Sequence, residues 1–214
     1  MLLLPMTTEE RIITPAYLWF DTEFTGLDVQ CASLLQVGLL VTDATLNRLT
    51  APARDVNLFI RLEPEASVSP WVEKNLAALL VQCRSEKAVT VAEADRRLAA
   101  LVDEAVGPLS ADIKRRPVLA GNTVHMDMVL VRKFLPEFMR RLHYRLLDVS
   151  TLKILWNDWS SEPVFDKSQP GMVERYVPAK VGLPAAGPHD AYYDIDASLA
   201  ELNYYRITHS RSQG

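Results

Sequence analysis

The chain has 214 residues, of which 49% are hydrophobic and 23% charged, a balance typical of a globular domain that buries a core. This composition excludes a disordered chain or a fibre, and the length requires only a single domain. The 23 Lys+Arg and 27 Asp+Glu give a formal net charge of −4, which at first argues against a nucleic-acid partner.

Three short apolar runs in the first third of the chain predict strands at residues 17–21, 34–41 and 56–62. A helix then begins at Ser69-Pro70, because Ser caps free backbone N–H groups and Pro at the first helical position loses no hydrogen bond. The apolar side of this helix is expected to consist of Trp71, Leu76, Leu79 and Leu80.

The middle of the chain alternates between helices and strands. Thr90-Val-Ala-Glu93 is a capping box, and it opens a helix that ends at Gly107. Strands are predicted at 117–121 and 144–149, and helices at 127–134, ended by Pro136, and at 150–158. A meander of strands followed by this alternation predicts an α/β fold with a mixed central sheet flanked by helices, antiparallel on one side and parallel on the other.

Residues 160–188 contain five Pro and three Gly, a composition that predicts a long loop. A last helix follows at about 189–207. The domain core therefore spans about residues 17–207, and residues 1–16 form an N-terminal extension of a single domain, 1–214.

Two acids stand at the end of the first predicted strand. Asp21 and Glu23 are at positions i and i+2, so both carboxylates point to the same face. Their mutual repulsion favours a cation between them, and hard divalent ions such as Mg²⁺ or Mn²⁺ prefer carboxylate oxygens. The alternative is a pair of solvated acids at a strand end.

Two further acids lie at the edges of hydrophobic elements. Asp127 begins a predicted helix and is either a further metal ligand or the N-cap of that helix. Asp194 lies inside the last helix, where it needs a partner, and positions 190, 191, 197 and 198 offer no Lys or Arg.

His189 precedes Asp194 by five residues, and on one helix the two side chains would point about 140° apart. If His189 lies in the loop before the helix, its imidazole can reach the acids and serve as a general base. A surface His beside a Pro turn is the alternative. Asp190 is a rival metal ligand, but its place favours a helix cap. Four carboxylates and one His suit phosphodiester hydrolysis with two metal ions.

These residues resemble the DEDDh group of DnaQ-like 3′→5′ exonucleases and, within it, the oligoribonucleases. The resemblance extends from about residue 17 to 206. It rests on Asp21-Thr-Glu23-Phe-Thr-Gly-Leu27-Asp28, Val41-Thr42-Asp43-Ala44, Gly121-Asn122-Thr123, Asp127, His143-Tyr-Arg-Leu-Leu-Asp-Val-Ser-Thr151, His189 with Asp194, and Ala200-Glu-Leu-Asn-Tyr-Tyr-Arg206.

The resemblance implies a ribonuclease-H-like fold and a homodimer that degrades very short single-stranded RNA to 5′-mononucleotides. It implies two divalent cations, Mg²⁺ or Mn²⁺, with His189 as general base. The implied metal ligands are Asp21, Glu23, Asp127 and Asp194, and the implied substrate contacts are Leu27, Trp71, Thr123, Tyr144, Arg145 and Ser150. Of these contacts, Tyr144 and Arg145 would reach the partner subunit's site, and Thr123 and Ser150 would lie near the terminal phosphate of the substrate.

Two alternatives remain open. One is a single-strand DNA exonuclease of the same superfamily, and the other is a catalytically silent RNA-binding module, which a lost acid would indicate. The chain also departs from the family pattern, because Leu76 stands where the family usually has a His. The charge of −4 equals the four acids of the expected site, and the balanced remainder fits a substrate with few phosphates.

Cys31 and Cys83 form no C-x-x-C pair, so neither a zinc site nor a disulfide is predicted and a reducing compartment is favoured. Residues 1–6 are too short for a signal sequence, and Glu9 and Glu10 argue against a transit peptide. No apolar run approaches the roughly 20 residues of a membrane helix. We expect a cytoplasmic protein with no membrane partner, with a mitochondrial address left open.

Overall fold

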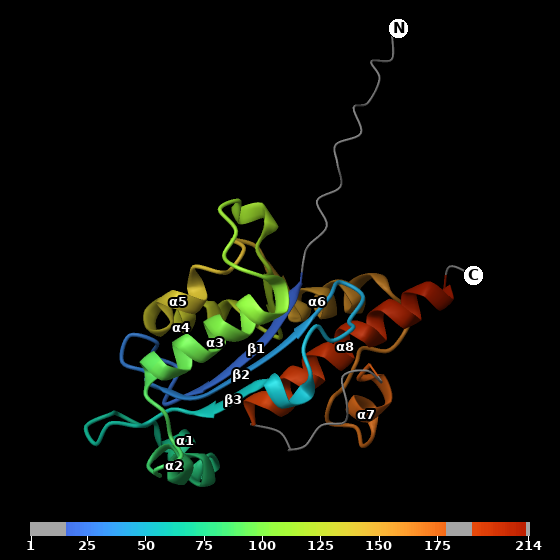
Figure 1. Cartoon of the computed structure of the whole chain (residues 1–214). Helices are drawn as coiled ribbons and strands as arrows, with labels where there is room; N and C mark the ends of the chain where they lie inside the picture. Colours follow the sequence, from blue (N-terminus) through green and yellow to red (C-terminus); the bar gives the residue numbers. More distant parts are fainter. Residues whose placement is uncertain (1–15, 179–189, 213–214) are drawn as a thin grey trace, which may run out of the picture.

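The structure, a computed structural model, describes residues 16–178 and 190–212, and a five-stranded mixed sheet forms its centre (Figure 1). The strand order is β3-β2-β1-β4-β5. β1 pairs antiparallel with β2, and β2 with β3, whereas β1 pairs parallel with β4, and β4 with β5. This confirms the predicted mixed α/β sheet. The strands span Tyr17–Phe24, Leu34–Thr42, Val56–Phe59, Val118–Gly121 and Leu146–Asp148 for β1 to β5.

Helices cover both faces of the sheet (Figure 1). One core, built from β1 and β2, packs under α3 (Val91–Val106), α4 (His125–Phe134) and α5 (Pro136–Met139). A second core lies on the opposite face under α6 (Val149–Trp159), α7 (Met172–Tyr176) and α8 (Ala191–Ser212). Within the described residues no helix is long and apolar enough to cross a membrane.

Side chains alternate between the two faces of the sheet along β1, and this alternation decides toward which face the acids point. Leu18 and Phe20 are buried in the first core and Trp19 in the second. Successive strand side chains point to opposite faces, so Asp21 and Glu23 continue the Trp19 side, toward α8. The intervening Thr22 points the other way, toward α4.

Two short helices, α1 (Pro70–Asn75) and α2 (Ala77–Cys83), form a small third core beside the sheet. The Oγ of Ser69 accepts a hydrogen bond from the backbone N–H of Val72, as the capping pattern predicts. The expected single helix is interrupted at Leu76, which is buried. Trp71 does not join the apolar side, because its side chain is 53% exposed.

Further sequence expectations need correction. The capping residue Thr90 accepts from the N–H of Glu93, but the Glu93 carboxylate pairs with Arg96 and Arg97. Pro136 ends α4 and also begins α5, because Pro is well suited to a first helical turn. The predicted loop at 160–188 contains α7, and its residues 179–188 lie outside the described part of the chain, as does nearly all of the predicted extension at 1–16.

Candidate active site

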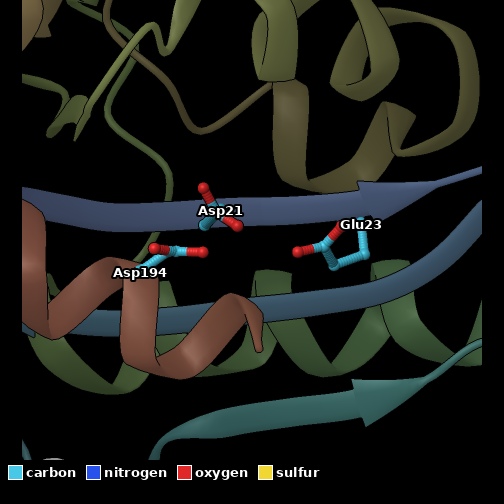
Figure 2. Close-up of side chains that lie close together, drawn as sticks. All are labelled: Asp21, Glu23 and Asp194. Atoms are coloured by element: carbon cyan, nitrogen blue, oxygen red, sulfur yellow. The ribbon is translucent and has the colours of Figure 1, made fainter. Parts of the chain in front are cut away.

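Three carboxylates from two elements meet on the α8 face of the sheet. Asp21 and Glu23 project from β1, and Asp194 projects toward them from the first turn of α8 (Figure 2). Each offers one carboxylate oxygen, and these oxygens all lie within 4.8 Å of one another. The structure therefore brings together three of the four acids predicted as metal ligands.

The fourth acid, Asp127, lies next to this carboxylate cluster of Asp21, Glu23 and Asp194. It is buried in the first turn of α4, and its Oδ1 accepts a hydrogen bond of 2.7 Å from the Oγ1 of Thr22. The helix begins two residues earlier, at His125, so the alternative interpretation of Asp127 as an N-cap is wrong.

The electrostatics of the site favour added positive charge. Burial, followed by the charges of Asp127, Asp194 and Glu23, raises the pKa of Asp21 well above its usual range. Burial and the neighbouring acids raise the pKa of Glu23 to about 7. Burial also raises the pKa of Asp127 to about 7, although the hydrogen bond from Thr22 acts in the opposite direction.

The start of α8, and with it Asp194, is held in place by Gln36 on β2. The Oδ1 of Asp190 accepts from the N–H groups of Tyr192 and Tyr193, which confirms the predicted cap. The Nε2 of Gln36 donates to the Oδ2 of Asp190 at 2.9 Å, and its Oε1 accepts from the N–H of Ala191.

β2 also lets α8 approach closely at Gly38. A Cβ at this position would lie 2.8 Å from Cδ1 of Ile195 and 3.4 Å from the backbone of Ala191. The missing side chain therefore allows the first turn of α8 to pack directly on the strand.

Sequence reasoning missed the partner of Asp194. The Nζ of Lys167, in the segment between α6 and α7, lies 2.5 Å from Oδ1 of Asp194. Burial lowers the pKa of Lys167, but the hydrogen bond to Asp194 and the negative charges of Asp194 and Asp21 together outweigh it, and the net shift is upward. Helical spacing reveals only partners on the same helix, whereas Lys167 comes from another segment of the chain. His189, the predicted general base, lies outside the described residues.

An apolar cleft opens beside the carboxylates. Its volume is about 570 Å³, and Glu23 is shared between the cleft wall and the carboxylate cluster. Two predicted substrate contacts line it, and both are exposed, Leu27 at 85% and Trp71 at 53%. The other lining residues are Phe24, Gly26, Ser69, Val72 and Leu76.

The remaining predicted contacts form two groups outside the lining of this cleft. The hydroxyls of Thr123 and Ser150 lie 3.1 Å apart, and the N–H of Thr123 also donates to Asp148. Tyr144 is exposed, stacks on His143 and lies beneath the guanidinium of Arg145.

The donor set fits divalent cations. Carboxylate oxygens are hard ligands, and three converging carboxylates, of which Asp21 and Glu23 have pKa values raised by burial and repulsion, are stabilised by a nearby positive charge. Asp21, Glu23 and Asp194 would hold such ions, with Asp127 beside them. Bound there, divalent cations supply charge stabilisation and an activated water for phosphodiester hydrolysis.

The fold and the acids define the chain as an exonuclease of ribonuclease-H-like fold. The family model described as "Exonuclease" matches residues 18–202. Exonuclease I of Methylocaldum szegediense has a similar structure, with a TM-score of 0.60 at 21% identity over 90% of this chain. This chain spans 40% of that protein's length.

More specific relatives share most of the chain. The human mitochondrial oligoribonuclease is 32% identical over 88% of this chain and 70% of the relative. The oligoribonuclease of Corynebacterium glutamicum is 31% identical over 94% of this chain and 86% of the relative. The chain belongs to the oligoribonuclease family.

Proposed function

We propose that the protein is a 3′→5′ exoribonuclease that degrades very short RNA oligonucleotides to 5′-mononucleotides. The observation that carries the proposal is the cluster of Asp21, Glu23 and Asp194 at the edge of the apolar cleft lined by Leu27 and Trp71. The cleft offers apolar and aromatic surface for stacking bases, and the cluster offers a site for the cations of a nuclease.

In this proposal Asp21, Glu23, Asp127 and Asp194 hold two divalent cations, Mg²⁺ or Mn²⁺. Asp127 joins the ligands from α4, and its charge already acts on both Asp21 and Glu23. His189 takes the proton of the attacking water. Its position in the sequence, directly before the residue that caps α8 and five residues before Asp194, supports this role.

The substrate occupies the cleft with its 3′ end toward the acids. Leu27 packs against a base, Trp71 helps to hold the 3′ end, and Thr123 and Ser150 bind the terminal phosphate of a short substrate. Leu76 makes its part of the cleft wall apolar, so we expect a weaker contribution from this side to phosphate binding.

We propose that the working enzyme is a homodimer in which Tyr144 and Arg145 reach the partner subunit's site. Supporting this, Trp159 on α6 is 80% exposed and borders an apolar groove between α6 and α8. Large exposed apolar patches are typical of protein interfaces. Tyr144 and α6 flank the edge strand β5, so one partner could cover both.

A cytoplasmic location stays a prediction. It is supported by two cysteines without a disulfide, the exposed Cys31 and the buried Cys83.

The direct test is the length profile of substrates. Labelled RNA of two, five and twenty nucleotides and the matching DNA are incubated with Mn²⁺, and with EDTA as control. We expect mononucleotides from the di- and pentanucleotide RNA and slow turnover of the longer strands. Persistence of the short RNA would contradict the proposal, and a preference for long DNA would favour the DNA exonuclease instead.

A further inference from the structure

Lys167 places a positive charge inside the carboxylate cluster. Its Nζ lies 2.5 Å from Oδ1 of Asp194, and its charge also lowers the pKa values of Asp21 and Glu23. Its charge therefore acts on all three acids of the cluster. The ammonium of Lys167 therefore lies where positive charge is needed to balance the carboxylates.

The segment that carries Lys167 is anchored on α8, the helix of Asp194. Phe165 is fully buried and packs against Tyr204 of α8, with ring centroids 5.8 Å apart. Next to it, the Oδ1 of Asp166 accepts from both the backbone N–H and the hydroxyl of Ser168, which fixes the turn at Lys167. The backbone of Lys167 is thus held at the cluster by contacts that need no ion.

The side chain itself is less constrained than its backbone. It is 47% exposed, so the ammonium can leave Asp194 toward solvent without disturbing the buried Phe165. A single ammonium supplies one positive charge to three carboxylates, and it occupies one carboxylate oxygen of Asp194, a residue that a divalent ion would also use.

We propose that Lys167 is a built-in counter-ion of the carboxylate cluster, which holds Asp194 in the ion-free enzyme and which divalent cations must displace. It is a positioning residue that sets the concentration of cation at which the site fills. The inference rests on the proposed metal site, since without divalent cations there is nothing to displace Lys167.

The test measures Mn²⁺ binding without RNA, by calorimetry or by the EPR signal of free Mn²⁺, at low ionic strength. Lys167→Gln removes the charge, Lys167→Arg keeps it, and Lys114→Gln removes an exposed charge from another part of the surface. We expect Lys167→Gln to bind Mn²⁺ about three to ten times more tightly than the wild type, because a competing cation is removed. Lys167→Arg and Lys114→Gln should bind as the wild type does.

Thermal unfolding separates this role from a merely structural one. Without divalent ions, Lys167→Gln should unfold at a lower temperature than the wild type, because the acids lose their counter-charge. Saturating Mn²⁺ should cancel that difference. Unchanged or weaker Mn²⁺ binding in a folded Lys167→Gln variant, or a loss of Tm that Mn²⁺ does not cancel, would overturn the inference. If the wild type binds no Mn²⁺, the proposed metal site itself fails.

Discussion

At the scale of single residues, Thr22 links the two sides of the sheet at the site. Its neighbours Asp21 and Glu23 face α8, whereas its own hydroxyl donates to the buried Asp127 on α4. This hydrogen bond lowers the pKa of Asp127, although burial still raises that pKa to about 7.

Thr22→Val should therefore raise the pKa of Asp127 further and lower stability by about 1–3 kcal/mol, the usual cost of an unsatisfied buried polar group. The acid limb of the pH–rate profile should move to higher pH. Thr42→Val is the matched control, because Thr42 is a buried strand residue that accepts a hydrogen bond from Trp19 away from the acids. It should lose stability and keep the wild-type pH profile. Coincident pH profiles for the two variants would contradict this role of Thr22.

The proposed roles of Asp21 and His189 can be separated by measuring binding and rate in the same variants. Asp21→Ala removes a metal ligand, so both Mn²⁺ binding and turnover should be lost. His189→Ala should bind Mn²⁺ nearly as the wild type does, while single-turnover cleavage slows about 10²- to 10⁴-fold because the general base is missing. A strong loss of Mn²⁺ binding in His189→Ala would show that His189 acts as a ligand instead.

At the scale of elements, the contacts of its first turn fix the position of α8 on the sheet. Gln36 is fully buried and bonds to Asn57, Asp190 and the N–H of Ala191, so it ties β2, β3 and α8 together. Asp194 follows one helical turn after Asp190, so a shift of the capped end of α8 also moves the Asp194 carboxylate.

Gln36→Leu keeps the volume and removes these hydrogen bonds. We expect a loss of about 2–3 kcal/mol in the free energy of unfolding, since the Asp190 carboxylate and the helix N–H lose their partner. Weaker Mn²⁺ binding should accompany it, because Asp194 is no longer held in register. Gln82→Leu, on α2, serves as control in chemical denaturation and Mn²⁺ titration. Wild-type Mn²⁺ affinity in Gln36→Leu would show that α8 is positioned without this clamp.

The elements also show which features the sequence predicts and which it cannot. The strand period places Asp21 and Glu23 on one face, and the Asp190 cap follows from local rules, because both depend on neighbouring residues alone. The Lys167–Asp194 pair depends on the path of a segment with few regular contacts, so no local pattern reveals it. The role of Asp127 was ambiguous because the start of a helix can be predicted only to within one or two residues. A shift of two residues changes Asp127 from an N-cap into a buried acid inside the first turn.

At the scale of the whole molecule, the clustered acids link stability to pH and to divalent ions. The pKa values of Glu23 and Asp127 are about 7 in the folded protein, above their usual values of 4.5 and 3.8. The folded state therefore binds more protons than the unfolded state between about pH 4 and 7, and this contribution to stability is lost as the pH rises through that window.

Divalent cations should replace the lost protons. We expect the rise in Tm on adding Mg²⁺ or Mn²⁺ to be small at pH 5 and large at pH 8, where the acids are ionised. An ion at 100 times its Kd adds about 2.7 kcal/mol to the free energy of unfolding. Scanning calorimetry at both pH values measures the effect, and Asp21→Asn is the control that should lose it. An ion effect of equal size at pH 5 and pH 8 would contradict the assignment of these pKa values.

The proposed homodimer can be tested on its exposed apolar surface. Trp159→Glu should shift the protein from dimer to monomer in light scattering, because it places a charge in the apolar interface. Val81→Glu is the matched control, since Val81 is 64% exposed on α2 and lies on another element. Mixing inactive Asp21→Ala with Tyr144→Ala dimers should restore activity if Tyr144 acts across the interface. A monomeric wild type, or no recovery on mixing, would contradict the arrangement.

The wide separation of the acids along the chain has a consequence for the order of events during synthesis. Asp21 is made early on β1, whereas Asp194 comes from α8, the last helix of the described chain. Contacts between distant residues form late, and a chain emerges from the ribosome from its N-terminus. A nascent chain that still lacks α8 has only part of the cluster. The complete carboxylate cluster can therefore form only after α8 has been synthesised.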